Sequence, residues 1–456
     1  IESETTIMTE QTRQHTNEQR EIRIGKLDQI RALGYEPFGQ AFNWDHSSTQ
    51  VIENADALEQ SGEHVRLAGR LMTIRDHGKT AFATLRDARG DIQHLLDRGD
   101  IIGVDGIVFR THTGEITVRV ESYTILTKAL RPLPDKWHGL TDKEQRYRMR
   151  YVDLIMNPEV RRTFETRTRM LAAIRKYYTE RGFLEVETPV LQPLYGGANA
   201  RPFITHLNAL DMTMYLRIAP ELYLKRLLVG GIDRNFEITR NFRNEGMDTK
   251  HNPEFTAIET YQAYGDIEDA IRQTEEVVAL CAQAAYGNTR FVYEGVELDV
   301  TPPWPRMTMV EAVKKFTGED FGDLSDLEHA RAIADKLNVE YGEFDGAGKI
   351  LANVFDDYVE DKLVQPCHIT MHPIEVSPLS KLNAENLRLT DRFESYIFTR
   401  ELANGFSELN DPLDQRKRFE LQQEEREHGD DEAHPVDEDF MKALEYGMPP
   451  TAGLGI

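Results

Sequence analysis

Charged side chains crowd into one stretch of the chain, residues 236–264, which reads FEITRNFRNEGMDTKHNPEFTAIETYQAY. Its two ends alternate as strands do, and its middle is typical of a turn between them. Arg243 and Glu245 then share one face of an extended segment, and Glu259 and Tyr261 share one face of the next strand. Charged groups that point inward are costly unless they meet a charged ligand. The pattern predicts a ligand-binding hairpin, and a solvated hairpin with surface ion pairs is the alternative.

A second polar stretch, later in the chain, reads RFESYIFTRELANGFSELNDP. Asn404, Phe406 and Glu408 are spaced by two, so they line one face of a strand. Glu394 and Glu401 are candidate metal carboxylates, because Mg²⁺ is usually held by one or two carboxylates together with phosphate oxygens. The stretch therefore predicts a magnesium and ligand site, and the alternative is an acidic edge strand.

These side chains need a sheet to position them. Residues 150–180 predict a helix, with apolar side chains at steps of three and four, and Gly182 ends it before the strand FLEVETPVL. Later strands alternate with helices without a repeated βαβ unit, which favours an antiparallel sheet flanked by helices. The sequence contains no GxxxxGK[ST] phosphate loop and no GxGxxG.

The front of the chain follows a different pattern. Four short segments between residues 64 and 126 are rich in β-branched residues and separated by glycine turns, which predicts a small barrel such as an OB-fold. Residues 16–33 form an amphipathic pattern, either a helix docked on its own domain or a basic face for RNA. The predicted divisions are a helical extension 1–63, the barrel 64–130, a linker 131–145 and a second domain 146–456.

Composition limits the class of protein. The 456 residues are 40% hydrophobic and 29% charged, which is typical of soluble globular domains. No apolar run is long enough to cross a bilayer, so no membrane partner is expected. Two distant cysteines predict neither a disulfide framework nor a zinc site, and favour a cytoplasmic location. The net charge of −24 opposes nucleic-acid binding by the whole molecule, but a local basic patch can still bind a polyanion.

Several segments resemble known enzymes. FRNEG followed by HNPEF resembles motif 2 of class II aminoacyl-tRNA synthetases, GFLEVETPVL resembles motif 1, and GMPPTAGLGI resembles the start of motif 3. GGANARPF, RIAPELYLKRLLVGG, ETYQAYGD and ELANGFSELNDP resemble the lysyl-tRNA synthetases in particular. The likeness runs along nearly the whole chain. It implies an α+β fold in which an N-terminal OB-fold anticodon-binding barrel precedes a class II catalytic domain.

The resemblance also implies an activity. Lysine would be activated by ATP with Mg²⁺ to lysyl-adenylate and pyrophosphate, and then transferred to the 3′ end of its tRNA. Arg243 matches the catalytic arginine, and a guanidinium suits carboxylate and phosphate oxygens. Glu394 and Glu401 match the magnesium carboxylates. The residues that match ATP contacts of the family are Arg243, Glu245, His251, Asn252 and Phe255.

A site for lysine needs acceptors for two ammonium groups. Gly197 and Glu221 match the family's contacts to the α-amine, and Glu408 and Tyr261 match its contacts to the ε-amine. The residues that match the remaining pocket wall are Glu259, Asn404 and Phe406. A buried carboxylate such as Glu408 is reasonable only when it meets a cation.

Two further partners follow from the resemblance. Phe82 and Gln93 match barrel positions where the family stacks on and hydrogen-bonds an anticodon base. Motif 1 builds a homodimer interface in such enzymes, although its helix could instead pack only on its own sheet. Motif 3 of the family continues into a helix with an arginine that contacts ATP, and the given sequence lacks this part of motif 3 and its arginine.

Three alternatives remain at this point. One is a related aspartyl- or asparaginyl-type synthetase, which Glu408 and the GFSELND segment disfavour. Another is a paralogue that lysylates a protein, but such enzymes lack the N-terminal barrel. The third is a non-catalytic tRNA-binding or regulatory paralogue.

Overall fold

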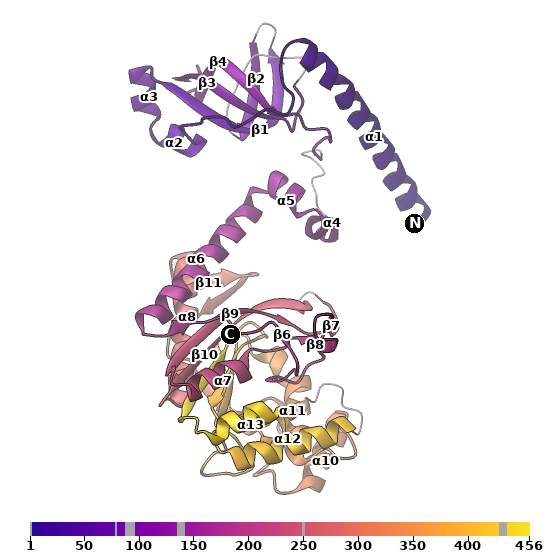
Figure 1. The fold of residues 1–456 in the computed structure, drawn as a ribbon, viewed down its shortest axis with the longest axis vertical. Helices are drawn as coiled ribbons and strands as arrows, with labels where there is room; N and C mark the ends of the chain where they lie inside the picture. The colour runs from indigo at the N-terminus through magenta and orange to yellow at the C-terminus, as the bar shows by residue number, and fades with distance from the viewer. Residues whose placement is uncertain (1, 78–79, 87–95, 135–141, 249–250, 428–435) are drawn as a thin grey trace. The chain divides into compact units, whose positions relative to one another are not determined.

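The structure is a computed structural model that describes residues 2–456, except 78–79, 87–95, 135–141, 249–250 and 428–435. The chain forms two compact units, Ile1–Arg161 and Arg162–Ile456, and each is described by itself (Figure 1). Among the described residues, no helix has both the length and the apolar character needed to span a membrane.

The first unit is built on an antiparallel sheet with the strand order β2-β1-β3-β4. All four strands coincide with segments predicted from sequence. Their bounds are β1 His64–His77, β2 Thr80–Arg86, β3 Ile101–Arg110 and β4 Ile116–Thr127. The helices are α1 Glu2–Ala32, α2 Ser48–Glu53, α3 Ala55–Ser61, α4 Lys143–Arg148 and α5 Arg150–Met156.

The apolar core of this unit lies between the sheet and its helices. Val65, Ile102 and Val104 from the strands pack with Ile30 of α1 and Leu58 of α3. Helix α1 therefore docks on its own domain, which is the simpler of the two interpretations of residues 16–33.

The second unit holds a larger sheet. Eight of its described strands are ordered β13-β14-β15-β16-β17-β10-β9-β5, antiparallel except for the pairs β13–β14 and β5–β9. The bounds are β5 Leu184–Glu185, β9 Arg234–Phe242, β10 Glu254–Ala263, β13 Arg306–Thr308, β14 Cys367–Thr370, β15 Arg392–Tyr396, β16 Glu401–Ser407 and β17 Thr451–Gly455. The expectation of an antiparallel sheet flanked by helices is confirmed.

Smaller elements surround this sheet. The minor strands are β6 Leu191–Gln192, β7 Ile204–Leu207, β8 Met212–Leu216, β11 Arg290–Tyr293 and β12 Val296–Asp299. The helices are α6 Pro158–Glu180, α7 Glu221–Val229, α8 Ile267–Tyr286, α9 Met309–Thr317, α10 Leu327–Leu337, α11 Ala347–Tyr358, α12 Pro412–Glu427 and α13 Glu438–Glu445, with 3-10 turns at Glu360–Lys362 and Ile374–Val376.

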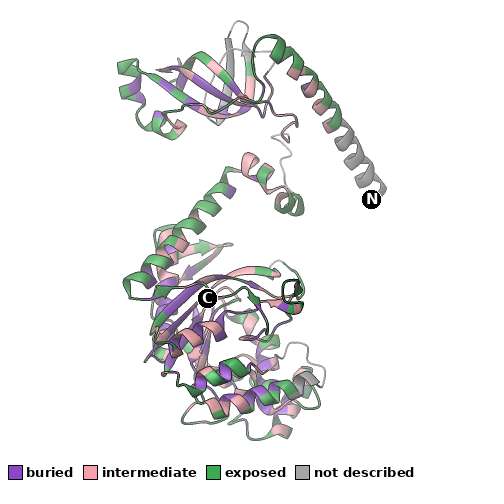
Figure 2. Ribbon diagram, viewed as in Figure 1, coloured by how far each residue is buried: buried purple, intermediate pink, exposed green. Residues whose placement is uncertain are grey.

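The two faces of the large sheet have different neighbours. On one face, Tyr178 of α6 and Val277 of α8 pack on Phe236 and Ile258 of the central strands. The other face presents Tyr261, near which α7, α12 and α13 form a second core. The central strands are therefore largely buried, as Figure 2 shows. Every second residue of β9 and β10 points away from α8, toward the side where α7 lies.

Two local predictions need correction. The helix expected over residues 150–180 is broken at Asn157 into α5 and α6, because Pro158 lacks the N–H that would continue the helix. The strand expected over FLEVETPVL is only Leu184–Glu185, with Leu191–Gln192 pairing in a separate sheet. Pro189 lies between these two short pieces and cannot donate a ladder hydrogen bond.

Candidate active site

A cavity of about 450 Å³ lies over the second face of the large sheet. Strand alternation explains its lining, because β10, β15, β16 and β17 each send every second residue to this face. Glu259 and Asn404 both pair with Gly455, and Glu394 pairs with Asn404. The residues expected from sequence that line the cavity are Gly197, Glu221, Arg243, Phe255, Glu259, Tyr261, Glu394, Glu401, Asn404, Phe406 and Glu408.

A glycine in β17 makes room for a carboxylate. Gly453 pairs with Tyr261 on one side and Phe406 on the other. A Cβ at Gly453 would lie 1.8 Å from Oε1 of Glu408, so any side chain there would displace that carboxylate. Gly197 has a φ of +91° and lies against Glu221, where a Cβ would come within 3.0 Å of the Glu221 Cβ. Both glycines let acidic side chains occupy the cavity wall.

A buried lysine joins two of the cavity's acids. Glu221 opens α7 and Lys225 follows one helical turn later, so the ammonium donates to Glu221 Oε1 at 2.5 Å. The same ammonium forms an ion pair with Glu408, which follows the end of β16. Lys225 is fully buried and Glu408 is 1% exposed. Within the described ranges, no donor other than Lys225 contacts the Glu408 carboxylate.

Two acids near Lys225, Glu259 and Glu408, hold protons more strongly than usual. Burial, and then the charge of Glu221, raise the pKa of Glu259 to about 8. Burial likewise raises the pKa of Glu408 to about 8, although the charge of Lys225 acts in the opposite direction. At neutral pH both carboxyls therefore favour the protonated state until a cation stabilises their ionised forms.

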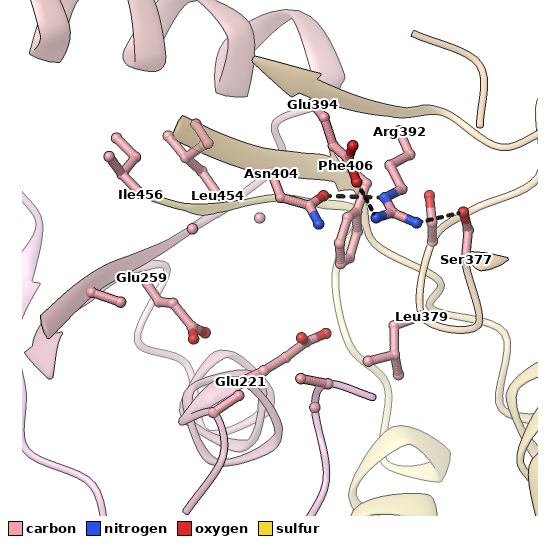
Figure 3. A pocket seen from close by; sticks show the side chains of 18 of the residues that line it. Glu221, Glu259, Ser377, Leu379, Arg392, Glu394, Asn404, Phe406, Leu454 and Ile456 are labelled. Carbon is pink, nitrogen blue, oxygen red and sulfur yellow. Dashed lines mark hydrogen bonds and ion pairs between the residues drawn. The ribbon is translucent and has the colours of Figure 1, made fainter. Parts of the chain in front are cut away.

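An arginine organises the other end of the cavity (Figure 3). Arg392 donates to Oε1 of Glu394 at 2.5 Å, to Oδ1 of Asn404 at 3.1 Å and to Oγ of Ser377 at 3.0 Å. Oε2 of Glu394 accepts a hydrogen bond from Tyr396 at 2.6 Å. Both oxygens of Glu394 are thus fixed in direction, and Asn404 is oriented by the same guanidinium.

Glu394 and Glu401 differ in their electrostatics. Burial alone would raise the pKa of Glu394, but the charges of His372 and Arg392 outweigh it, and the pKa is lowered. Desolvation by neighbouring groups, and then the charge of Glu394, raise the pKa of Glu401 to about 8. The side chain nevertheless keeps an exposed surface. One ionised carboxylate therefore lies near a second that would ionise readily if a cation approached.

Arg243 follows the end of β9 and points into the cavity. Its guanidinium carbon lies 5.1 Å from the centre of the Phe255 ring, which is a cation–π distance. Its Nε is buried and has no hydrogen-bond acceptor within the part of the chain that the structure describes. A fixed cation with an unused donor is suited to an anionic ligand.

Three residues expected at the ATP site lie outside this cavity lining. Glu245, His251 and Asn252 occupy the turn between β9 and β10 and are exposed. His251 contacts Asp248 at 2.8 Å, and Asn252 donates to the backbone carbonyl of Glu254 at the start of β10. The hairpin itself agrees with the sequence prediction, but the structure does not gather these three with the other site residues.

The two expected anticodon residues lie largely outside the described structure. Phe82 belongs to β2, where it pairs with Arg75, but its side chain is outside the described part. Gln93 lies within residues 87–95, which are not described. Their roles remain predictions from the resemblance.

Sequence reasoning missed three residues of the site. Lys225 lies in the quoted segment RIAPELYLKRLLVGG, where its spacing of four from Glu221 was the available signal. Arg392 opens the second polar stretch and alternates with Glu394, but nothing local marks its partners. Gly453 lies in the quoted segment GMPPTAGLGI, where nothing local shows that its contact with Glu408 requires glycine.

Comparisons with known proteins agree with this geometry. Residues 142–456 match the family model "tRNA synthetases class II (D, K and N)", and residues 65–126 match "OB-fold nucleic acid binding domain". A lysine–tRNA ligase of Moorella thermoacetica is 54% identical over 451 residues, which is 95% of this chain and 92% of that protein. A lysine–tRNA ligase of Bacillus subtilis is 50% identical over 468 residues, covering 98% of this chain and 94% of that protein.

The chain is thus a class II aminoacyl-tRNA synthetase with an N-terminal OB-fold domain. Within that class it belongs to the lysine–tRNA ligases, which use ATP to join an amino acid to tRNA. The predicted fold class and activity are confirmed. The similarity to lysine–tRNA ligases decides against the aspartyl, asparaginyl and non-catalytic alternatives.

Proposed function

We propose that the cavity activates lysine and that Arg243 is its catalytic residue. The observation that supports this most is the gathering of five glutamates and the Arg243 guanidinium around one space of about 450 Å³, with the Nε of Arg243 left without an acceptor among the described residues. Arg243 binds the lysine carboxylate and the α-phosphate of ATP, which positions the carboxylate oxygen for attack on the α-phosphorus. Pyrophosphate leaves, and the arginine offsets the charge that develops during the step.

The two ammonium groups of lysine bind at different walls. Glu221 and the backbone of Gly197 accept the α-ammonium, and Glu408 with Tyr261 accepts the ε-ammonium. Glu259, Asn404 and Phe406 complete the pocket. This assignment is supported by the raised pKa of Glu259 and Glu408, because carboxylates short of positive charge are stabilised by a cationic side chain.

ATP occupies the part of the site near Arg243. Phe255 is the stacking surface for the adenine ring, since one of its faces already holds the guanidinium at 5.1 Å. Glu245 and Asn252 bind the adenine end and His251 binds the phosphates. These three are exposed in the turn after β9, so their contacts require that the turn meets ATP directly.

Glu394 and Glu401 fit a divalent cation. Both line the cavity, and the raised pKa of Glu401 reflects in part the charge of Glu394, which a cation would offset. Magnesium held by these two carboxylates would neutralise charge on the phosphates of ATP. Arg392 and Tyr396 keep Glu394 ionised and oriented for this role, through hydrogen bonds to both of its oxygens.

The activated lysine passes to the 3′ end of its tRNA, and the OB-fold domain reads the anticodon. Phe82 stacks on an anticodon base and Gln93 hydrogen-bonds to it. A homodimer through motif 1 is supported by exposed apolar side chains at Leu184, Val190 and Leu191. Two free cysteines, Cys281 and Cys367, fit a reducing cytoplasm.

ATP–pyrophosphate exchange with each of the twenty amino acids, without tRNA, tests the assignment of the pocket. We expect exchange that depends on lysine and Mg²⁺, and loss of that exchange in Arg243→Lys, because an ammonium cannot replace a planar two-pronged guanidinium. Lysine-dependent exchange that persists at the parental rate in Arg243→Lys would contradict the catalytic role. Light scattering of the same preparation measures the proposed dimer.

A further inference from the structure

Lys225 lies behind the wall of the cavity, in contact with two of the acids that line it. Its side chain is fully buried on α7, and its ammonium touches the carboxylates of Glu221 and Glu408. The Phe406 ring lies 5.6 Å from the same nitrogen. The two acids that it joins are the ones proposed above to accept the two different ammonium groups of the substrate. One internal cation therefore connects both ends of the pocket.

The fixed charges of the pocket do not cancel. Glu221, Glu259 and Glu408 are three acids, and Lys225 is the one basic side chain in contact with any of them among the described residues. When ionised, this group has a surplus of two negative charges. Lysine contributes two ammonium groups, and its carboxylate is matched separately by Arg243. A substrate with two ammonium groups thus balances the pocket, whereas a neutral side chain leaves one charge buried and unmatched.

We propose that Lys225 is a positioning residue that determines specificity, because it orients Glu221 and Glu408 and sets the charge of the pocket to match a diammonium substrate. This inference rests on the proposed lysine site. Lys225 does not contact the reacting atoms. Its ammonium balances one of the three carboxylate charges. The two ammonium groups of the substrate then balance the other two.

The proposed role of Lys225 predicts how the lysine affinity of a Lys225 variant changes with pH. The titratable groups that face Glu408 are Lys225 and Glu221 from α7, and Glu259 and Tyr261 from β10. Removing the positive charge of Lys225 leaves only acidic neighbours, so Glu408 holds its proton to higher pH. Lysine binding must displace that proton. The loss of lysine affinity in such a variant, relative to the parent, is therefore large at neutral pH. It disappears as the pH rises and the acids ionise.

The experiment measures the lysine KM in pyrophosphate exchange from pH 6.5 to 9 for the parent and for Lys225→Gln. The ratio of the two KM values removes the titration of lysine itself. We expect a ratio of about tenfold or more at pH 7, one pKa unit being a factor of ten, falling toward one at pH 9. The ATP KM should stay unchanged. Lys176→Gln is the matched control, since Lys176 also pairs with a glutamate four residues away but is exposed.

Lys225→Arg keeps the charge and serves as a second variant if Lys225→Gln does not fold. Its KM ratio to the parent should not vary with pH, and a varying ratio would overturn the inference. A Lys225→Gln ratio that is constant from pH 6.5 to 9 would mean a merely structural role and would also overturn it. Glu408→Gln distinguishes a failure of the proposed lysine site from a failure of the inference about Lys225. If it leaves the lysine KM unchanged, the lysine site is wrong, and if it raises the KM beside a constant Lys225→Gln ratio, only this inference fails.

Discussion

Each unit of this protein buries one lysine between two acids, and the two clusters behave differently. In the first unit, Lys128 is fully buried and donates to Asp97 at 2.6 Å and to both oxygens of Asp100. In the second unit, Lys225 joins Glu221 and Glu408. The two arrangements have the same composition of charges at their centres, and the two acids of the second, Glu221 and Glu408, line the cavity described above.

The difference lies in how the acids are satisfied. Asp100 also accepts hydrogen bonds from the backbone N–H groups of Ala129 and Asp97, and Asp97 accepts one from Lys26. Burial raises the pKa of Asp97, but hydrogen bonds from Lys128 and Lys26 outweigh burial, so the pKa is lowered. No further cation or donor supports Glu408 in the described structure, and its pKa is raised to about 8. A cluster whose carboxylates have all their hydrogen-bond and charge partners stabilises the fold. A cluster whose carboxylates lack such partners can bind a cationic ligand.

The largest expected effect is on stability in the first cluster. Lys128→Met leaves the buried Asp100 and the partly buried Asp97 without their shared cation and should destabilise the first unit by about 3–5 kcal/mol. Thermal or urea unfolding measures this, and lysine-dependent pyrophosphate exchange should persist below the new transition. Arg148→Met removes an exposed pair in the same unit and is the control. Equal stability of Lys128→Met and Arg148→Met would refute the structural role.

The second prediction concerns binding in the other cluster. Glu408→Gln removes one acceptor charge from the desolvated pocket and should weaken lysine use by about 2–5 kcal/mol, with little change in ATP affinity. Exchange kinetics with varied lysine and varied ATP separate the two effects. The comparison predicts little loss of stability here, because the removed charge is already poorly satisfied. An unchanged lysine KM would contradict the assignment of the ε-ammonium.

The third prediction separates the functions of the two units. Phe82→Ala should weaken tRNA binding by about 1–3 kcal/mol through loss of one stacked base, while adenylate formation stays intact. Aminoacylation, pyrophosphate exchange and melting temperature are measured on one preparation. If Phe82 instead fills a core, both activities and the melting temperature fall together.

The smallest expected effect is a pH dependence of lysine affinity. The pKa of Glu259 and of Glu408 is raised to about 8, so their protonated forms dominate below that value and lysine binding releases protons. Raising the pH from 7 to 8 should strengthen binding by up to about tenfold per proton displaced, and the gain should end above the raised pKa. Titration calorimetry in buffers of different ionisation enthalpy counts the protons. Affinity that falls between pH 7 and 8 would contradict the direction of both shifts.

The raised pKa values of Glu259 and Glu408 also affect folding. Raising the pH strengthens lysine binding but lowers the stability of the folded protein without lysine. Ionising a group whose pKa is higher in the folded state than in the unfolded state disfavours folding. The contribution of Glu259 and Glu408 to stability is therefore fully present below their unfolded pKa and is lost as the pH rises toward 8. Lysine should restore it, because a bound cation stabilises the ionised forms.

Much of the site followed from local patterns. The spacing of two at Asn404, Phe406 and Glu408 placed them on one strand face, and the structure pairs β16 with β15 and β17 as that alternation requires. The strands of the first unit were also predicted, since β-branched runs between glycines have few alternatives. The helix over residues 150–180 was wrong in detail because its periodicity continues across Pro158.

The sequence by itself determined the family, the strand alternation and which acids share a face, because these depend on residue order alone. Only the tertiary structure decided which charges are buried and which are matched. Glu221 and Lys225 look like an ordinary exposed pair at helical spacing, yet packing against β10 and β16 excludes water from both and adds Glu408 to the pair. Burial and charge surplus depend on neighbours nearly two hundred residues apart, so no local pattern could reveal them.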